Sequence, residues 1–270
     1  MPRISVGDVS YHCVEQGTGE PVLLLHGFTG SSAAWSPVLP ALARRYRVIA
    51  VDLLGHGESD APDDPARYAM ERVVWDIATL LDILAAGPAA LVGYSMGGRL
   101  ALYLALHIPE RWRALVLECA SPGLATEAER VERAAQDEAL AARIEELGIE
   151  RFIASWEQLP LFASQQSLPE TVRAEQRRWR LQNRPAGLAG SLRGMGTGVQ
   201  PSLWERLGEL RPPTLLLAGA LDEKFVGIAR KMARAIPEAT LDLVPDAGHT
   251  IHLEQPERWL RLVTGWLEEL

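Results

Sequence analysis

A serine with a glycine two positions away on each side lies at residues 93–97, directly after the apolar run 89–92. Such glycines are needed where a serine occupies a tight turn from a strand into a helix, because larger side chains would collide with the neighbouring backbone. The apolar segment 98–106 then has the length of a buried helix, which would place the Ser95 hydroxyl at a helix N-terminus. The pattern predicts a nucleophile elbow, although alone it fits an ordinary strand-loop-helix corner equally well.

A serine becomes a nucleophile or a base only with a histidine and an acid beside it. The strand-like run 214–219 leads into a loop that contains Asp222, and a second predicted strand, 240–244, is followed by His249. The chain therefore offers Ser95, Asp222 and His249 in the order serine, acid, histidine. We predict these three as the catalytic residues.

Two other carboxylates compete with Asp222 for the part of the acid. Glu223 is its neighbour, and Glu118 follows a predicted strand at 113–117, where some enzymes with this order of motifs keep their acid. Asp222 is favoured because it lies on a loop after a late strand.

The remaining histidines near these motifs have competing interpretations. His26 is favoured as a structural residue that braces the loop after an early strand, and His56 as part of a glycine-rich architectural turn. His252 could line a pocket, be solvated or cap a helix.

An early segment supplies the missing part of such a site. The buried-strand run 22–25 is followed by His26-Gly27-Phe28, and the amides of Phe28 and Met96 are predicted to form an oxyanion hole. Together the four motifs resemble the α/β-hydrolase superfamily, and the resemblance covers residues from about 20 to 270. It implies a mostly parallel central sheet with helices on both faces and an inserted helical cap.

The order of elements agrees with that fold class. Between about residues 121 and 204 the alternation of strands and helices stops, and 127–147 is rich in Ala, Glu and Arg with helical character. We expect a core formed by 1–120 and 205–270, with a cap at 121–204. Strands are expected near residues 4–14, 22–26, 47–52, 89–94, 113–118, 214–219 and 240–244.

Composition narrows the possible partners. A net charge of −8 disfavours nonspecific binding to nucleic acid or to anionic membranes. No apolar run reaches the length of a membrane-spanning helix and no secretory signal is present at the N-terminus, so a cytoplasmic protein without membrane insertion is expected. Cys13 and Cys119 are far apart and are expected to be buried and reduced, with no metal-binding spacing. The sequence does not indicate an oligomeric state.

The predicted cap has an unusual local charge. Residues 151–200 contain seven arginines, no lysine and three acids, which gives a local charge of +4. Arginine binds carboxylates through a rigid, permanently charged fork, so an acidic small-molecule substrate is favoured. A solvated arginine-rich helix face remains the alternative for any single residue. Arg99, four residues after Ser95, would lie close to the catalytic mouth.

A narrower resemblance rests on further motifs. The chain resembles the family of 2-succinyl-6-hydroxy-2,4-cyclohexadiene-1-carboxylate synthases of menaquinone biosynthesis. The resemblance implies a lyase that removes pyruvate from 2-succinyl-5-enolpyruvyl-6-hydroxy-3-cyclohexene-1-carboxylate, a polycarboxylate, without metal or cofactor. The motifs that carry it are Gly93–Arg99, Pro122–Leu124, Asn183–Pro185, Ala189–Gly198, Gln200–Trp204 and Asp222–Phe225.

The same resemblance implies substrate-binding residues. Tyr94 and Arg99 match within the elbow, and Arg133 matches a cap arginine that holds a substrate carboxylate. Trp156 matches a pocket tryptophan, although a place in the cap core fits it equally well. A third arginine falls near Arg180, but Arg177 and Arg178 lie within one helical turn and stay possible.

Two other functions use the same residues. A carboxylesterase or a carbon-carbon bond hydrolase would share the serine, acid and histidine, and would form an acyl-enzyme on activated esters. A noncatalytic receptor-like relative would keep the fold and the pocket, but it would leave the complete set of motifs unexplained.

Overall fold

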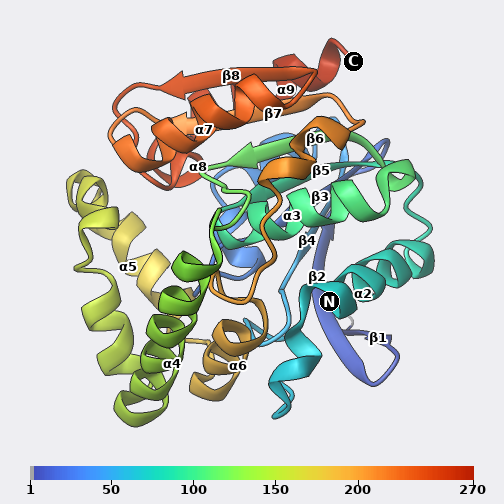
Figure 1. Ribbon diagram of the computed structural model, residues 1–270. Helices are drawn as coiled ribbons and strands as arrows, with labels where there is room; N and C mark the ends of the chain where they lie inside the picture. The colour runs from blue at the N-terminus through green and yellow to red at the C-terminus, as the bar shows by residue number, and fades with distance from the viewer. Residues whose placement is uncertain (1–2) are drawn as a thin grey trace.

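The computed structural model describes residues 3–270, which build one eight-stranded sheet with the strand order β1-β2-β4-β3-β5-β6-β7-β8 (Figure 1). Strands β3 to β8 are parallel to one another. The expected mostly parallel central sheet is confirmed. The strands are β1 (Arg3–Val6), β2 (Val9–Gln16), β3 (Pro21–Leu25), β4 (Arg47–Val51), β5 (Ala89–Tyr94), β6 (Trp112–Glu118), β7 (Thr214–Gly219) and β8 (Ala239–Val244).

The single strand expected at 4–14 is wrong, because this segment forms a hairpin. β1 and β2 pair antiparallel, with Val6 opposite Val9, and Gly7 has a positive φ of 60° in the turn between them. Glycine adopts that left-handed conformation without steric cost. The hairpin therefore gives the sheet an antiparallel edge, since β2 also pairs antiparallel with β4.

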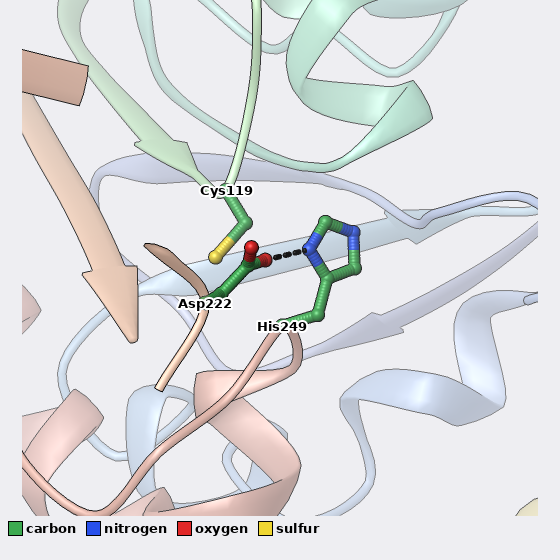
Figure 2. Close-up of side chains that lie close together, drawn as sticks. All are labelled: Cys119, Asp222 and His249. Atoms are coloured by element: carbon green, nitrogen blue, oxygen red, sulfur yellow. Dashed lines mark hydrogen bonds and ion pairs between the residues drawn. The ribbon is translucent and has the colours of Figure 1, made fainter. Parts of the chain in front are cut away.

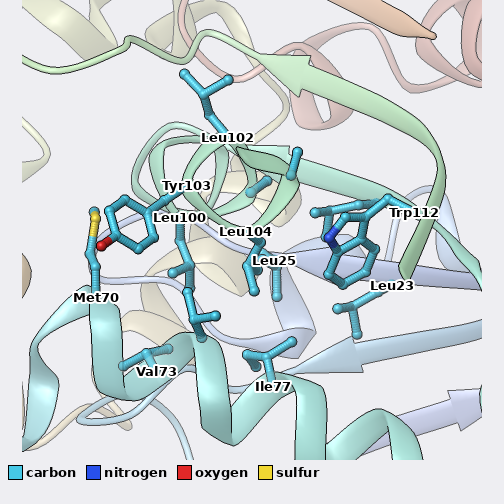
Figure 3. Packing of buried hydrophobic residues seen from close by; sticks show 14 of the residues in the cluster. Leu23, Leu25, Met70, Val73, Ile77, Leu100, Leu102, Tyr103, Leu104 and Trp112 are labelled. Atoms are coloured by element: carbon cyan, nitrogen blue, oxygen red, sulfur yellow. The ribbon is translucent and has the colours of Figure 1, made fainter. Parts of the chain in front are cut away.

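Helices cover both faces of the sheet, and the side chains of β3 show why. Leu23 and Leu25 pack against α2 and α3 on one face (Figure 3), whereas Val22 and Leu24 pack on the other face in the cluster that includes α1 and α9. Alternate residues of a strand point to opposite faces, so a strand buried on both faces is apolar throughout. The helices of the core are α1 (Leu39–Leu42), α2 (Met70–Ile83), α3 (Met96–His107), α7 (Glu223–Ala235), α8 (Ile251–Glu254) and α9 (Pro256–Glu268), with short 3₁₀ turns η1 (Ser32–Trp35), η2 (Pro65–Tyr68), η3 (Pro109–Arg111) and η5 (Trp204–Glu209).

Between β6 and β7 the chain leaves the sheet and forms a layer of helices, gathered at one end of the molecule in Figure 1. The long helix α4 begins with a capping box between Thr126 and Glu129, and it bends at Gly148, whose φ of 72° is not helical. This layer has a small apolar core of its own, in which Ile144 and Phe152 of α4 pack with Leu188 of α6. Its elements are α4 (Glu127–Trp156), η4 (Pro160–Ser167), α5 (Glu170–Arg180) and α6 (Pro185–Met195).

Across residues 3–270, no helix combines the length and the hydropathy needed to cross a bilayer.

Candidate active site

Ser95 lies in the turn between β5 and α3, in a strained backbone conformation with φ 51° and ψ −109°. The turn is possible because the neighbouring backbone is very close. A Cβ atom on Gly97 would lie 2.2 Å from the carbonyl oxygen of Leu25, and one on Gly93 would lie 2.5 Å from that of Gly97. The spacing of the two glycines is therefore a packing requirement, and it leaves Ser95 at the N-terminus of α3.

The structure brings Ser95, Asp222 and His249 together. His249 Nε2 lies 3.0 Å from Ser95 Oγ, and His249 Nδ1 lies 2.7 Å from Asp222 Oδ2. Because a carboxylate only accepts, Nδ1 carries the hydrogen and Nε2 is free to accept the serine proton. Both Asp222 and His249 are buried. The arrangement can activate the serine hydroxyl as a nucleophile or as a base.

Close packing of two loops positions the acid and the histidine. The Leu221 amide donates to the carbonyl of Ala247 at 3.0 Å, and a Cβ atom on Gly219 would lie 1.9 Å from the carbonyl oxygen of Gly248. Asp222 also caps α7, because its Oδ1 accepts from the Phe225 amide at 3.3 Å. The carboxylate is therefore held from two sides.

The competing acid Glu118 has a different environment. It is fully buried and accepts hydrogen bonds from His252 Nδ1 at 2.9 Å and from Trp259 Nε1 at 2.8 Å. His252, for which solvation was one expectation, is also buried, and its ring stacks near Trp35. Glu223 is exposed on the first turn of α7. Of the three carboxylates, Asp222 is the one hydrogen-bonded to His249.

Cys119 is a neighbour that the sequence did not connect with the site. Its sulfur lies within 4.8 Å of a carboxylate oxygen of Asp222 and a ring nitrogen of His249. Figure 2 shows the three side chains close together. The thiol is buried, and burial raises its pKa well above the ordinary value. The direct hydrogen bond between Asp222 and His249 accounts for their closeness, so Cys119 serves as an apolar neighbour of the acid.

A cavity of about 230 Å³ opens beside Ser95, between the sheet and the helical layer. Seven of the predicted site residues line it, and Tyr94, Asp222 and Arg180 do not. These seven are Phe28, Ser95, Met96, Arg99, Arg133, Trp156 and His249.

Two arginines give this cavity a positive wall. Arg99 Nη1 donates to the Met195 carbonyl at 3.0 Å and to Gln200 Oε1 at 2.6 Å, and Arg133 Nε donates to Asp137 at 2.7 Å. Burial, reinforced by the nearby charge of Arg133, lowers the pKa of the Arg99 guanidinium to about 10. Arg99 bonds only to neutral acceptors, a carbonyl and an amide, and a pKa of about 10 leaves it charged at neutral pH, so its part of the cavity is suited to an anion.

Tyr94 and Arg180 lie outside that cavity, next to a smaller one. The Tyr94 hydroxyl lies 2.7 Å from Thr250 Oγ1, and the centre of its ring lies 5.5 Å from that of His249. The Arg180 guanidinium stacks 5.1 Å from the centre of the Phe162 ring, and burial lowers its pKa. Phe162 lines the same small cavity as Tyr94 and Arg180, and its ring centre lies 6.3 Å from that of His249.

Lys224 is a cavity residue that was not singled out from the sequence. The sequence left Arg177 and Arg178 open as alternatives to Arg180. Arg177 forms an ion pair with Glu157 at 2.6 Å, and Arg178 is exposed. The signal for Lys224 was its position two residues after Asp222, as one of only two lysines in the chain. It adds a third positive charge to the cavity wall.

Two buried histidines support the loop that carries Phe28. His26 Nδ1 donates to the Gly27 carbonyl at 2.8 Å, and His26 Nε2 accepts from the Leu53 amide at 2.9 Å. His56 packs against the Phe28 ring with 5.7 Å between ring centres. Burial lowers the pKa of His26, and it lowers the pKa of His56 to about 3. Both rings are therefore neutral in the folded protein.

His56 should make stability depend on pH. Its pKa falls from about 6.5 in the unfolded chain to about 3 on folding, so acid protonates the unfolded state first and the stabilisation is lost as pH falls below 6.5. We expect His56→Gln to reduce the loss of unfolding free energy between pH 7 and pH 5 by about 2 kcal/mol. Urea unfolding at both pH values measures it, with His107→Gln, at an exposed histidine, as the matched variant. Equal pH dependence in His56→Gln and wild type would contradict this account.

Comparisons with known proteins agree with the geometry. The model of the alpha/beta hydrolase fold matches residues 20–256. A Bacillus subtilis (strain 168) protein that carries the provisional name 2-succinyl-6-hydroxy-2,4-cyclohexadiene-1-carboxylate synthase is 46% identical, over 99% of this chain and 98% of its own length.

Two solved structures are also similar. MenH from S. aureus superposes with a TM-score of 0.91 at 39% identity, covering 96% of this chain and 98% of the other. A thermophilic esterase from Thermogutta terrifontis, solved with malate bound, has a TM-score of 0.88 at 30% identity, over 100% and 99% of the two chains.

Proposed function

The chain belongs to the alpha/beta hydrolase family, and we propose that it is a lyase of menaquinone biosynthesis that eliminates pyruvate from 2-succinyl-5-enolpyruvyl-6-hydroxy-3-cyclohexene-1-carboxylate. The product is 2-succinyl-6-hydroxy-2,4-cyclohexadiene-1-carboxylate. The observation that carries the proposal is the combination of a serine-histidine-aspartate site with a cavity that has a positive wall, in a chain 46% identical to the Bacillus subtilis protein.

The reaction begins with removal of a proton from the ring carbon next to the succinyl carbonyl. Ser95 takes this proton as its own hydroxyl hydrogen passes to His249 Nε2, and Asp222 stabilises the resulting imidazolium. The electron pair of the broken C–H bond moves onto the carbonyl oxygen to form an enolate. The Phe28 and Met96 amides are proposed to stabilise that oxygen, since both residues line the cavity beside Ser95.

Collapse of the enolate completes the elimination. The carbonyl re-forms, a double bond forms between the deprotonated carbon and its ring neighbour, the existing ring double bond shifts by one position, and the bond to the enolpyruvyl oxygen breaks. His249 gives up its extra proton to the leaving enolpyruvate, which becomes pyruvate. Arg99 and Arg133 are proposed to hold substrate carboxylates during these steps. Tyr94, Trp156 and Arg180 are proposed to complete the binding site, Tyr94 and Arg180 from the adjoining smaller cavity.

We also propose that residues 121–204 act as a cap domain over the core formed by 1–120 and 205–270. The small apolar cluster within the helical layer supports this division. The cap supplies Arg133 and Trp156, whereas the core supplies the serine, acid and histidine. Substrate choice and chemistry are then carried by different parts of the chain.

The test is release of pyruvate from the enolpyruvyl substrate by the wild-type protein, followed with a coupled assay and corrected for spontaneous decay. We expect rapid release. Absence of release above the spontaneous rate, together with turnover of activated esters, would show the second candidate, a carboxylesterase for acidic substrates. The similarity to the Thermogutta terrifontis esterase favours that alternative over other functions.

Arg133 separates the two functions. Losing a charge-assisted hydrogen bond to a carboxylate costs about 1.5–3 kcal/mol, so Arg133→Ala should raise KM for the polycarboxylate roughly 10- to 100-fold. Hydrolysis of a small neutral ester by the same variant should change little. Arg130→Ala is the matched variant, because Arg130 lies on the same helix, pairs with Glu127 and does not line the cavity. Equal KM values for Arg133→Ala and wild type would contradict the proposed contact.

A further inference from the structure

The loop that carries the Phe28 amide is held in an unusual conformation. The Gly30 amide donates to the Gly27 carbonyl at 2.9 Å, and between them Thr29 has a positive φ of 65°. A β-branched residue in that region is strained and persists only where the surroundings hold it. The direction of the Phe28 amide, one residue earlier, depends on whatever fixes this turn.

Asn183 of the helical layer is one of the groups that fixes it. Asn183 is 3% exposed and lies in the short connection between α5 and α6. Asn183 Nδ2 donates to the Thr29 carbonyl at 2.8 Å and to the Arg180 carbonyl at 3.0 Å, while Oδ1 accepts from the Gly57 amide at 3.0 Å. A single buried amide thus joins the strained turn, the end of α5 and the turn at Gly57.

The next residue makes a contact that is useful for comparison. Arg184 Nη2 donates to the Ser59 carbonyl, so it ties the same segment of the helical layer to the same core turn as Asn183 does. Gly187 of α6 also packs directly on Gly55. A Cβ atom on Gly187 would lie 2.3 Å from the Gly55 carbonyl oxygen. The helical layer therefore has several contacts with the core besides those of Asn183. Arg184 and Gly187 contact only the turn at 55–59, whereas Asn183 also bonds to Thr29.

We propose that Asn183 is a positioning residue, which sets the Phe28 amide through the Thr29 carbonyl and thereby makes the oxyanion hole depend on the docked cap. The inference rests on the oxyanion role that the proposed function gives to Phe28. Loss of one oxyanion donor costs about 100- to 1000-fold in rate, and displacement by about 1 Å can cost 100-fold. An Asn183 variant, in which the donor remains but is less well placed, should lose roughly 10- to 100-fold.

Two substitutions test the amide group. Asn183→Asp keeps an acceptor for Gly57 but puts a carboxylate against the carbonyls of Thr29 and Arg180, and Asn183→Ala removes all three bonds. The first readout is the rate at which a small uncharged fluorophosphonate labels Ser95, which requires the serine, histidine and oxyanion hole but no carboxylate binding. The second readout is the division of any loss between kcat and KM for pyruvate release.

We expect labelling to slow at least 10-fold in both variants and kcat to fall with little change in KM, at temperatures well below the unfolding midpoint. Arg184→Ala removes a hydrogen bond between the same segment of the helical layer and the core, but leaves the bond to Thr29 in place. This variant should be labelled at a rate within about twofold of wild type. Labelling near the wild-type rate in Asn183→Ala, an equal loss in Arg184→Ala, or unfolding of both Asn183 variants while Arg184→Ala stays folded would overturn the proposal. Because labelling is independent of the natural substrate, failure to release pyruvate leaves this result readable.

Discussion

Ser95→Ala should reduce pyruvate release at least about 1000-fold while leaving the fold intact. The variant removes the atom that lies 3.0 Å from His249 Nε2, and within residues 3–270 no other side chain is hydrogen-bonded to that nitrogen. General base catalysis alone contributes about 100- to 10,000-fold, and the residues of such a site act as a unit. The removed hydroxyl is small, so the unfolding midpoint should move little. The coupled pyruvate assay, corrected for spontaneous decay, measures the loss.

Ser191→Ala is the matched variant for this experiment. Ser191 also lines the cavity, but its hydroxyl donates to the sulfur of Met96 at 3.7 Å, whereas Ser95 is the hydroxyl bonded to His249. We expect its rate to stay within a few-fold of wild type. If Ser95→Ala kept more than a tenth of the wild-type rate, the proton would have to be removed by another group, and the role proposed for Ser95 would be wrong.

The parts of the site that depend on local backbone geometry could be predicted from the sequence. A Cβ atom on Gly93 or Gly97 would lie 2.5 or 2.2 Å from a backbone carbonyl oxygen, so only glycine fits at these positions. The elbow can therefore be recognised from the sequence. The positions of Asp222 and His249 follow from parallel strands, whose carboxyl ends meet at one edge of the sheet. The order of the motifs along the chain was therefore enough to predict that Asp222 and His249 lie close together.

Features that depend on packing between distant elements could not be predicted in the same way. The number of arginines in the helical layer says nothing about which of them faces the cavity, and the structure places Arg133 there but stacks Arg180 on Phe162. Two of the three hydrogen bonds of Asn183, those to Gly57 and Thr29, join residues more than 120 positions apart in sequence, so no local pattern indicates them. The hairpin at the N-terminus was missed although the sequence carries a local signal for it, since Gly7-Asp8 separates two short alternating runs.

The second large effect concerns the choice between the two buried carboxylates, Asp222 and Glu118. Asp222→Asn should lower the rate of pyruvate release roughly 1000- to 10,000-fold with a nearly unchanged unfolding midpoint. An amide opposite His249 Nδ1 favours the tautomer that carries its hydrogen on Nε2, and that nitrogen then cannot accept the proton of Ser95. The pyruvate assay and a thermal unfolding experiment on the same sample measure both quantities.

Glu118→Gln should show the reverse pattern. The carboxylate of Glu118 accepts from the ring and the amide of His252 and from Trp259, and an amide presents an NH₂ group to one of these buried donors. Breaking this network should cost about 2–4 kcal/mol of unfolding free energy, or roughly 5–10 °C in the midpoint. Activity measured well below that temperature should stay within a few-fold of wild type, because Glu118 is hydrogen-bonded to His252 and not to His249. An inactive but stable Glu118→Gln beside an active Asp222→Asn would instead assign the acid to the end of β6, and would overturn the assignment of Asp222.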